Sequence, residues 1–288
     1  MMPVSYDPTK QFEIKTWDVE YRRDPTRTLM ARIYQPQGDG PFPALLDVHG
    51  GAWNDQDRKA NAAMDERLVA SGILVVAIDL RLAKEVPYPA SVADANYGVR
   101  WLKSKALEWK GDPETVGALG SSSGGHVIEL CAMRPRDPRY NALPLPDAPH
   151  LDATLKYVIA RSPVSDPFVR YENAKKMERK NLIENSEIYF SPWEAISEGN
   201  PQQILERGES VALPPLFILQ GELDDNVLPA VQKRFADTYR AAGGEIDFEV
   251  FPGAEHTWVQ HPGPQTDRAI EMVKAFIARQ LRLRQPLG

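Results

Sequence analysis

Short runs of apolar residues recur along the whole chain and alternate with longer stretches of mixed polarity. These runs are rich in Val, Ile and Leu, and each has the length of one β-strand. Several are apolar at consecutive positions, which is typical of strands covered on both faces of a sheet. The predicted strands are 12–20, 29–34, 44–48, 73–78, 116–119, 155–160, 216–219 and 246–251.

The stretches between these runs carry a helical period. In the segment 92–106, apolar residues at Val92, Ala95, Val99 and Leu102 fall on one face of a helix. Further helices are predicted at 57–70, 231–242 and 270–281. Alternation of strands and helices at this spacing predicts an α/β fold, with an eight-stranded, mostly parallel sheet flanked by helices.

One segment interrupts this alternation. Residues 166–212, between the sixth and seventh predicted strands, contain no convincing strand and are too long for an ordinary loop. The portions 171–181 and 201–209 look helical. We therefore expect a single domain over residues 1–288 with a helical lid inserted at 166–212. The segment 135–149 carries five prolines and is predicted to be a surface loop.

Composition narrows the class of protein. The chain has 288 residues, 42% of them hydrophobic and 26% charged, with a net charge of −6, which is ordinary for a globular enzyme. It has no basic stripe, so nucleic acid is not an expected partner. No apolar run reaches the roughly 18 residues of a membrane span, and the N-terminus does not resemble a signal peptide, so we expect a cytoplasmic protein. Dimerisation through an edge strand or the last helix is possible. The single cysteine, Cys131, excludes an internal disulfide.

The candidate nucleophile lies in a run of three serines. Only Ser122 has a glycine two positions away on each side, at Gly120 and Gly124. This Gly-x-Ser-x-Gly pattern follows an apolar run and precedes a helix-like segment, so a strand can turn sharply into a helix with the serine exposed on the corner. The N-terminus of that helix favours developing negative charge.

A serine hydroxyl requires donors that stabilise the oxyanion formed when it attacks a carbonyl. The predicted strand 44–48 leads into the sequence His-Gly-Gly-Ala-Trp at 49–53. Its glycines allow backbone amides to turn toward a substrate oxygen. We predict that Gly51 and Ala52 supply these amides, together with the amide of Ser123.

The acid that orients the base is expected after a late strand. The run 216–219 leads to a Gly-x-x-Asp-x-x-Val turn whose acid is Asp224. Asp225 is its neighbour and competes for the role, and Asp166 is a third candidate. Asp224 is preferred because the spacing lets Val227 pack against the turn.

The base is expected on a loop after the last strand. His256 lies there, five residues beyond the run 246–251, whereas His261 lies farther from the strand end. His126 is predicted to pack in the helix after Ser122, and His49 to orient its loop. The order Ser122, Asp224, His256 along the chain is that of α/β-hydrolases and differs from the two common serine-protease orders.

These motifs together resemble the α/β-hydrolase superfamily, in particular the esterase/lipase group with a His-Gly-Gly oxyanion motif. Within it, the chain is similar to hormone-sensitive-lipase-like esterases and to the smaller bacterial esterases akin to feruloyl esterases and kynurenine formamidases. Further matches are the segments 79–82, 87–90 and 111–113. The chain departs from lipase-like members at Ala52, which replaces a third glycine, at Leu80, which replaces a tyrosine, and at Ser121 and Ser123 beside the nucleophile.

The resemblance implies a serine carboxylesterase that hydrolyses small to medium esters through an acyl-enzyme, without a metal or organic cofactor. The alternative activity is that of an arylformamidase or amidase, and a non-catalytic ligand receptor of the same fold is the third possibility. Aromatic residues beside the motifs and in the insertion predict an apolar pocket suited to aromatic esters. The expected pocket residues are Trp53, Trp258, Phe168, Phe190 and Trp193.

Overall fold

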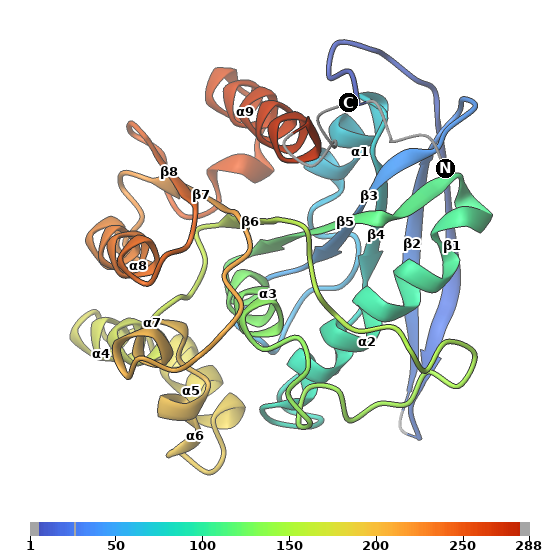
Figure 1. Cartoon of the computed structure of the whole chain (residues 1–288). Coiled ribbons are helices and arrows are strands. Elements are labelled where there is room, and N and C mark those ends of the chain that lie inside the picture. The colour runs from blue at the N-terminus through green and yellow to red at the C-terminus, as the bar shows by residue number, and fades with distance from the viewer. Residues whose placement is uncertain (1–5, 26, 283–288) are drawn as a thin grey trace.

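The core of the molecule is one eight-stranded sheet, seen in a computed structural model that describes residues 6–25 and 27–282 (Figure 1). The strands are β1 Ile14–Arg23, β2 Thr28–Pro36, β3 Phe42–Val48, β4 Leu74–Ile78, β5 Gly111–Ser121, β6 Val158–Arg161, β7 Leu216–Gly221 and β8 Ile246–Phe251. Their order across the sheet is β1-β2-β4-β3-β5-β6-β7-β8. Every predicted strand is present, and each overlaps its predicted range.

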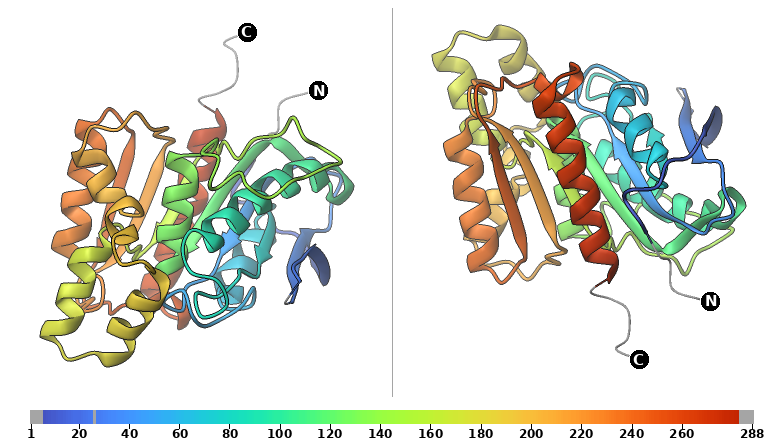
Figure 2. Two further views of the ribbon diagram at one scale, coloured as in Figure 1. Left: turned by 90° about the horizontal axis from the view of Figure 1, so that it is seen from below. Right: turned by 90° about the horizontal axis from the view of Figure 1, so that it is seen from above.

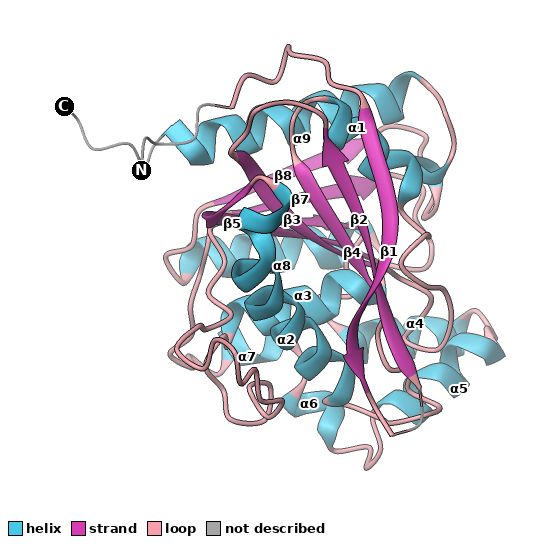
Figure 3. Cartoon of the chain, turned by 90° about the vertical axis from the view of Figure 1, so that its right-hand side faces the viewer, coloured by secondary structure: helices cyan, strands magenta, loops and turns pink. Residues whose placement is uncertain are grey.

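The sheet is mostly parallel, as predicted. Strands β4, β3, β5, β6, β7 and β8 run parallel to one another, whereas β2 pairs antiparallel with both β1 and β4. The β1–β2 pair forms a long twisted hairpin at one edge of the sheet (Figure 3). Since parallel strands share one direction, their carboxyl ends meet along a single edge, where α/β proteins usually place their ligands.

The strands are apolar without alternation because both faces of the sheet are covered. In β3, Leu46 and Val48 pack into the core under α2, α3 and α8, whereas Leu45 packs into the core under α1 and α9. These helices lie on opposite sides of the sheet in Figure 1. Their bounds are α1 Ala62–Ala70, α2 Ala90–Lys105, α3 Ser123–Met133, α8 Pro229–Ala241 and α9 Pro264–Arg282. Short 3-10 turns follow α2 (η1, Ala106–Trp109) and precede α9 (η2, Trp258–Gln260).

Helix α1 is shorter than predicted. Residues 57–61 form turns instead of helix, with the carboxylate of Asp57 accepting a hydrogen bond from the amide of Lys59. The side chain of Asn61 then points to Asp47 of β3 instead of continuing a helical surface. The end of the helix agrees with the prediction, because Gly72 follows it with a φ of 97°.

The insertion after β6 is helical, as predicted. It contains α4 Pro167–Lys176, α5 Lys180–Tyr189, α6 Ala195–Glu198 and α7 Pro201–Glu206, which lie together at one end of the molecule in both views of Figure 2. The predicted continuous helix at 171–181 is wrong. The chain breaks between α4 and α5, where Glu178 adopts a left-handed φ of 53°.

The proline-rich segment 135–149 contains neither helix nor strand, as predicted, yet it is not confined to the surface. Tyr140 is completely buried, and its hydroxyl lies 2.6 Å from the hydroxyl of Tyr88. Leu145 and Ala148 are also buried. The segment therefore closes part of the core beside α2.

The turn from β5 into α3 is strained and tightly enclosed. Ser122 has a φ of 51° and a ψ of −117°, a conformation that non-glycine residues rarely adopt. A Cβ atom on Gly120 would lie 2.6 Å from the carbonyl oxygen of Gly124. A Cβ on Gly124 would lie 2.2 Å from the carbonyl oxygen of His49 and 2.3 Å from that of Val48. The two glycines therefore permit backbone contacts that no other residue allows.

A buried polar cluster lies beneath this turn, between β3, β6 and α1. Asn61 donates to Asp47 at 2.8 Å, and its amide oxygen accepts from Ser121 at 2.8 Å and from Arg161 at 2.5 Å. Asp65 is also fully buried, and neither of its carboxylate oxygens has a hydrogen-bond partner in the described part of the chain. Burial raises the pKa of Asp47 to about 7, and burial together with the charge of Asp47 raises the pKa of Asp65 well above its ordinary value.

The enclosure of Gly124 predicts a large effect of a single methyl group. Gly124→Ala places a Cβ against the carbonyls that end β3, which cannot move without displacing the sheet. We expect the free energy of unfolding to fall by about 3 kcal/mol or more. Urea denaturation measures it. Gly263→Ala is the matched control, because open space surrounds that position, and it should change stability by less than about 1 kcal/mol. If both substitutions lowered the free energy of unfolding equally, the close backbone contact at Gly124 would be disproved as the cause.

The buried carboxyl of Asp65 predicts a distinct pH dependence of stability. A carboxyl whose pKa is raised on folding keeps its proton in the folded protein while the unfolded chain releases it, so stability falls as pH rises above about 4. Asp65→Asn removes this penalty. The variant should be more stable than the parent, by a margin that grows from about pH 5 to about pH 8. Denaturation curves across this range test it. Asp39→Asn at the exposed Asp39 is the control, and a margin that does not change with pH would contradict the prediction.

Candidate active site

Three polar side chains meet at the carboxyl edge of the sheet. Ser122 follows β5, Asp224 follows β7 and His256 follows β8. The Nε2 atom of His256 lies 3.0 Å from the Oγ of Ser122, and its Nδ1 atom lies 2.7 Å from Oδ2 of Asp224. Both distances are those of hydrogen bonds. The structure thus brings the predicted nucleophile, base and acid into one hydrogen-bonded chain.

Both carboxylate oxygens of Asp224 accept hydrogen bonds. Its Oδ1 accepts from the backbone amides of Asn226 and Val227, at 3.0 and 2.8 Å, and its Oδ2 also accepts from the Nε2 of Gln220 at 3.1 Å. Burial raises the pKa of Asp224, but its hydrogen bonds, above all that from His256, outweigh burial and hold the pKa below its ordinary value. An ionised Asp224 accepts a hydrogen bond from the Nδ1–H group of His256, which leaves Nε2 as the acceptor for the hydroxyl of Ser122.

The loop after β3 turns its backbone toward Ser122. Gly51 and Ala52 have left-handed φ values of 93° and 49°. Within the described residues, the amides of Gly51, Ala52 and Ser123 donate to no acceptor, so all three are free to bind an oxygen atom. The hydroxyl of Ser123 accepts from the amide of Trp53 at 3.1 Å. That hydroxyl therefore fixes the loop against the start of α3.

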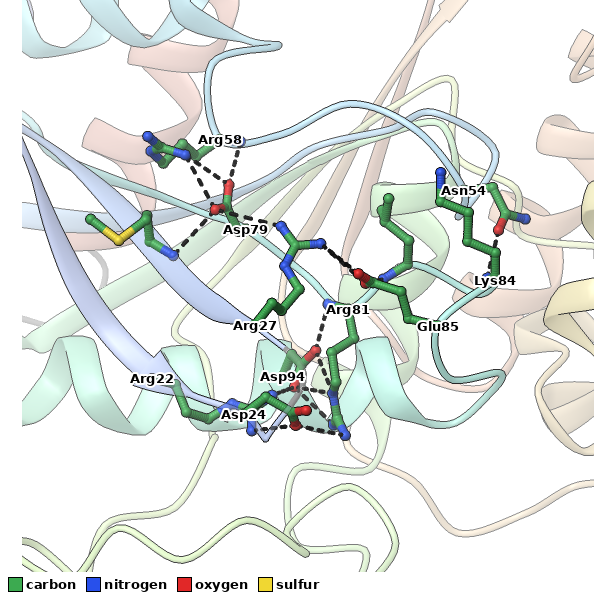
Figure 4. Close-up of polar contacts among 12 residues, drawn as sticks. Arg22, Asp24, Arg27, Asn54, Arg58, Asp79, Arg81, Lys84, Glu85 and Asp94 are labelled. Atoms are coloured by element: carbon green, nitrogen blue, oxygen red, sulfur yellow. Dashed lines mark hydrogen bonds and ion pairs between the residues drawn. The ribbon is translucent and has the colours of Figure 1, made fainter.

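A network of ion pairs and hydrogen bonds ties the loop after β3 to the end of β4 and to the segment that follows β4 (Figure 4). Asp79, at the end of β4, accepts from the amide of Arg58 at 3.1 Å and pairs with its guanidinium at 3.2 Å. Asn54 accepts from the amide of Lys84 at 2.8 Å. Arg81 pairs with Asp94 of α2 at 2.9 Å, so the segment that carries these contacts is itself tied to a helix.

Two further histidines, His126 and His49, are buried and pack within the protein. His126 is fully buried, where its Nδ1 accepts from the indole of Trp53 at 3.2 Å and its Nε2 lies 2.7 Å from the carbonyl oxygen of Gly199. Burial lowers the pKa of His126 to about 4. His49 is also buried, with its Nδ1 2.9 Å from the carbonyl oxygen of Gly50. These positions agree with the packing and loop-orienting roles predicted for the two residues.

The competing candidates lie elsewhere. Asp225 is exposed and forms an ion pair with Arg179. Asp166 accepts from the amide of Val169 at 3.1 Å and caps α4. His261 is exposed beyond η2.

A cleft of about 260 Å³ opens above Ser122 and His256, with walls from the loop after β3, from the insertion and from the loop after β7. This volume is small for a ligand site. Leu182 is the largest apolar side chain of its wall. The polar side chains that line it, besides Ser122 and His256, are Asp55, Gln56, Ser121, Arg161, Arg170, Asn181, Asn185, Asn226, Thr257 and Gln260.

The predicted aromatic pocket is therefore wrong, since none of the five expected aromatic residues lines this cleft. Trp53 and Phe190, the latter at the end of α5, are buried, and Trp53 stacks on Tyr189 with ring centroids 4.5 Å apart. Trp258 packs against Phe251, and Trp193 against Tyr171. Phe168 is exposed at the surface. Aromatic rings stabilise the protein more by packing against one another than by lining a wet cleft.

Sequence reasoning missed the two arginines of the cleft. Arg161 ends β6, in a run that reads as a buried strand, and Arg170 lies in α4. A charge inside an apolar run is the signal that could have identified Arg161, because unpaired charges are rarely buried. Nothing in the local pattern distinguishes Arg170 from a surface residue.

Within residues 6–25 and 27–282, histidine, cysteine, aspartate and glutamate side chains form no group of three or more that could hold a metal ion. Nor is any helix there long and apolar enough to cross a membrane.

Solved structures with a similar fold include esterases. Esterase 2 of Thermogutta terrifontis, with propionate bound, matches with a TM-score of 0.71 and 22% identity over 93% of this chain and 94% of that chain. Esterase B of Lactobacillus rhamnosis matches with a TM-score of 0.77 and 21% identity over 95% of this chain and 89% of that chain. The chain therefore has the α/β-hydrolase fold that its sequence predicts.

Curated relatives include esterases of Mycobacterium tuberculosis. The probable carboxylic ester hydrolase LipM of Mycobacterium tuberculosis is 27% identical over 226 residues, which are 76% of this chain and 50% of LipM. Esterase LipC of the same organism is 26% identical over 269 residues, 90% of this chain and 64% of LipC. The chain thus spans between half and two thirds of these relatives. The family model named BD-FAE matches residues 32–238, most of the chain, and the protein belongs to that family.

Proposed function

We propose that the protein is a serine carboxylesterase in which Ser122 is the nucleophile, His256 the general base and Asp224 the acid. The observation that carries this proposal is the hydrogen-bonded chain from Ser122 through His256 to Asp224, beside three free backbone amides. The names of relatives such as LipM and LipC support an ester substrate.

In the first half of the reaction, the Oγ of Ser122 attacks the carbonyl carbon of the ester while its proton passes to Nε2 of His256. Asp224 stabilises the imidazolium that forms. The amides of Gly51, Ala52 and Ser123 donate to the oxyanion of the tetrahedral intermediate. A donor of this kind typically lowers the activation free energy by about 3 kcal/mol. The intermediate collapses when His256 returns its proton to the leaving alcohol.

In the second half, a water molecule attacks the acyl-enzyme. His256 takes a proton from this water, and the same amides stabilise the second oxyanion. Protonation of Ser122 then releases the acid. The insertion supplies Asn181, Leu182 and Asn185 to the wall of the cleft, so we assign it the role of a lid that shapes the substrate site.

The nucleophile can be tested by covalent labelling. A fluorophosphonate probe should label the folded protein stoichiometrically, because it phosphonylates a serine activated by a base. Ser122→Ala should remove the label, while Ser162→Ala should retain it. Labelling is measured by intact-protein mass spectrometry. A folded protein that resists the probe would overturn the proposal. Relative rates on p-nitrophenyl acetate and N-formylkynurenine then separate an esterase from an arylformamidase.

The acid can be tested by an isosteric substitution. Asp224→Asn should lower kcat about 10⁴-fold, because the amide favours the wrong tautomer of His256. KM should change little. Asp225→Asn is the matched control and should leave kcat close to that of the parent protein, since Asp225 faces solvent. If the two variants exchanged their effects, Asp225 would be the acid.

A further inference from the structure

Arg170 is a buried cation whose hydrogen-bonding capacity is mostly unused. Its side chain projects from α4 of the insertion, is only 4% exposed, and lines the cleft above Ser122. Its Nε donates to Asn226 at 3.0 Å. Neither Nη1 nor Nη2 has an acceptor among the described residues. The guanidinium lies over the ring of Trp53, with its Cζ atom 5.3 Å from the ring centroid, a cation–π contact.

A second arginine lines the same cleft from the sheet. Arg161 is 6% exposed, and its Nη2 donates to Asn61 and Ser121, both at 2.5 Å. The two guanidinium groups belong to different layers of the molecule, one to β6 and one to α4. The wall near them also holds the amide side chains of Asn181, Asn185 and Asn226, which can donate hydrogen bonds.

The negative charges around the cleft do not neutralise Arg170. Asp224 lies close enough to affect the charge of Arg170, but both of its oxygens already accept hydrogen bonds from other groups. Asp55 is exposed at the rim. Burial lowers the pKa of Arg170 to about 10, so the side chain stays protonated at neutral pH.

An unpaired buried cation destabilises a folded protein unless a ligand supplies the missing acceptors. The planar fork of a guanidinium matches a carboxylate, which accepts two parallel hydrogen bonds. The cleft holds about 260 Å³, so the ligand that fits it is short.

We propose that Arg170, with Arg161, forms a carboxylate-binding subsite, and that the substrate is a short ester that also bears a free carboxylate. This inference rests on the proposed esterase function and adds the class of substrate. The carboxylate binds at the arginines while the ester carbonyl lies between Ser122 and the amides of Gly51 and Ala52.

Two matched pairs of esters test the subsite. Monoethyl glutarate is compared with ethyl 4-carbamoylbutanoate, and 4-acetoxybutanoate with 4-acetoxybutanamide, so that each pair differs only in a carboxylate or a carboxamide. We expect kcat/KM to favour the carboxylate by about 30- to 100-fold in at least one pair. Arg170→Gln should abolish that preference, so that the ratio of kcat/KM between the two members of each pair falls to about 1.

Arg179→Gln is the control for general electrostatics, because Arg179 is a cation of the same insertion that does not line the cleft. It should retain the preference. If Arg170→Gln slowed both members of each pair equally, Arg170 would act only on Asp224 and the subsite would be disproved. No preference in the parent protein would also disprove it. Arg170→Lys keeps the charge and should retain part of the preference. It replaces Arg170→Gln as the test variant if that protein does not fold.

Binding without turnover separates this inference from the proposed activity. Calorimetry of Ser122→Ala with monoethyl glutarate and with its carboxamide should give at least about tenfold tighter binding of the carboxylate. Equal affinities would overturn the subsite even if the parent protein hydrolyses neutral esters. Carboxylate selectivity in a protein that resists the fluorophosphonate probe would instead overturn the esterase function alone.

Discussion

The geometry of the candidate site depends on one backbone-to-backbone approach. The first turn of α3 lies so close to the end of β3 that only a hydrogen atom fits between Gly124 and the carbonyls of Val48 and His49. Ser122 precedes this contact and the loop with Gly51 and Ala52 follows it. The proposed nucleophile and the amides of Gly51 and Ala52 that are proposed to bind the oxyanion, about seventy residues away in sequence, are thereby held at a fixed separation without any side chain between them.

The surrounding contacts maintain that separation from several directions. The hydroxyl of Ser123 accepts from the amide of Trp53, and Asp79 holds the distal part of the same loop through Arg58. On the other side, the cluster of Asp47, Asn61 and Arg161 joins β3 to β6 beneath the serine. The site therefore sits between two polar networks that resist displacement, in a sheet that is otherwise apolar.

The sequence was informative wherever function depends on backbone geometry. Runs of Val, Ile and Leu located every strand, and the glycines at 120 and 124 singled out Ser122, because few residues tolerate those conformations. It was uninformative where function depends on the direction of a side chain. Trp53 follows a left-handed turn that directs its ring into the core. Arg170 is a candidate binding residue only because of its contacts with Trp53, Asn226 and the cleft. These surroundings come from segments that are far apart in the sequence.

His126 joins two parts of the molecule that would otherwise be independent. Since its Nδ1 accepts from Trp53, its proton lies on Nε2 and is donated to Gly199 of the insertion. The loop after β3, the helix after Ser122 and the insertion thus share one neutral imidazole. The inner side of the insertion is in consequence packed into the same framework that holds Ser122. Residues on the cleft-facing side of the insertion can therefore be exchanged without disturbing this junction, whereas replacement of the whole insertion would have to preserve the contacts of Gly199 and Tyr189.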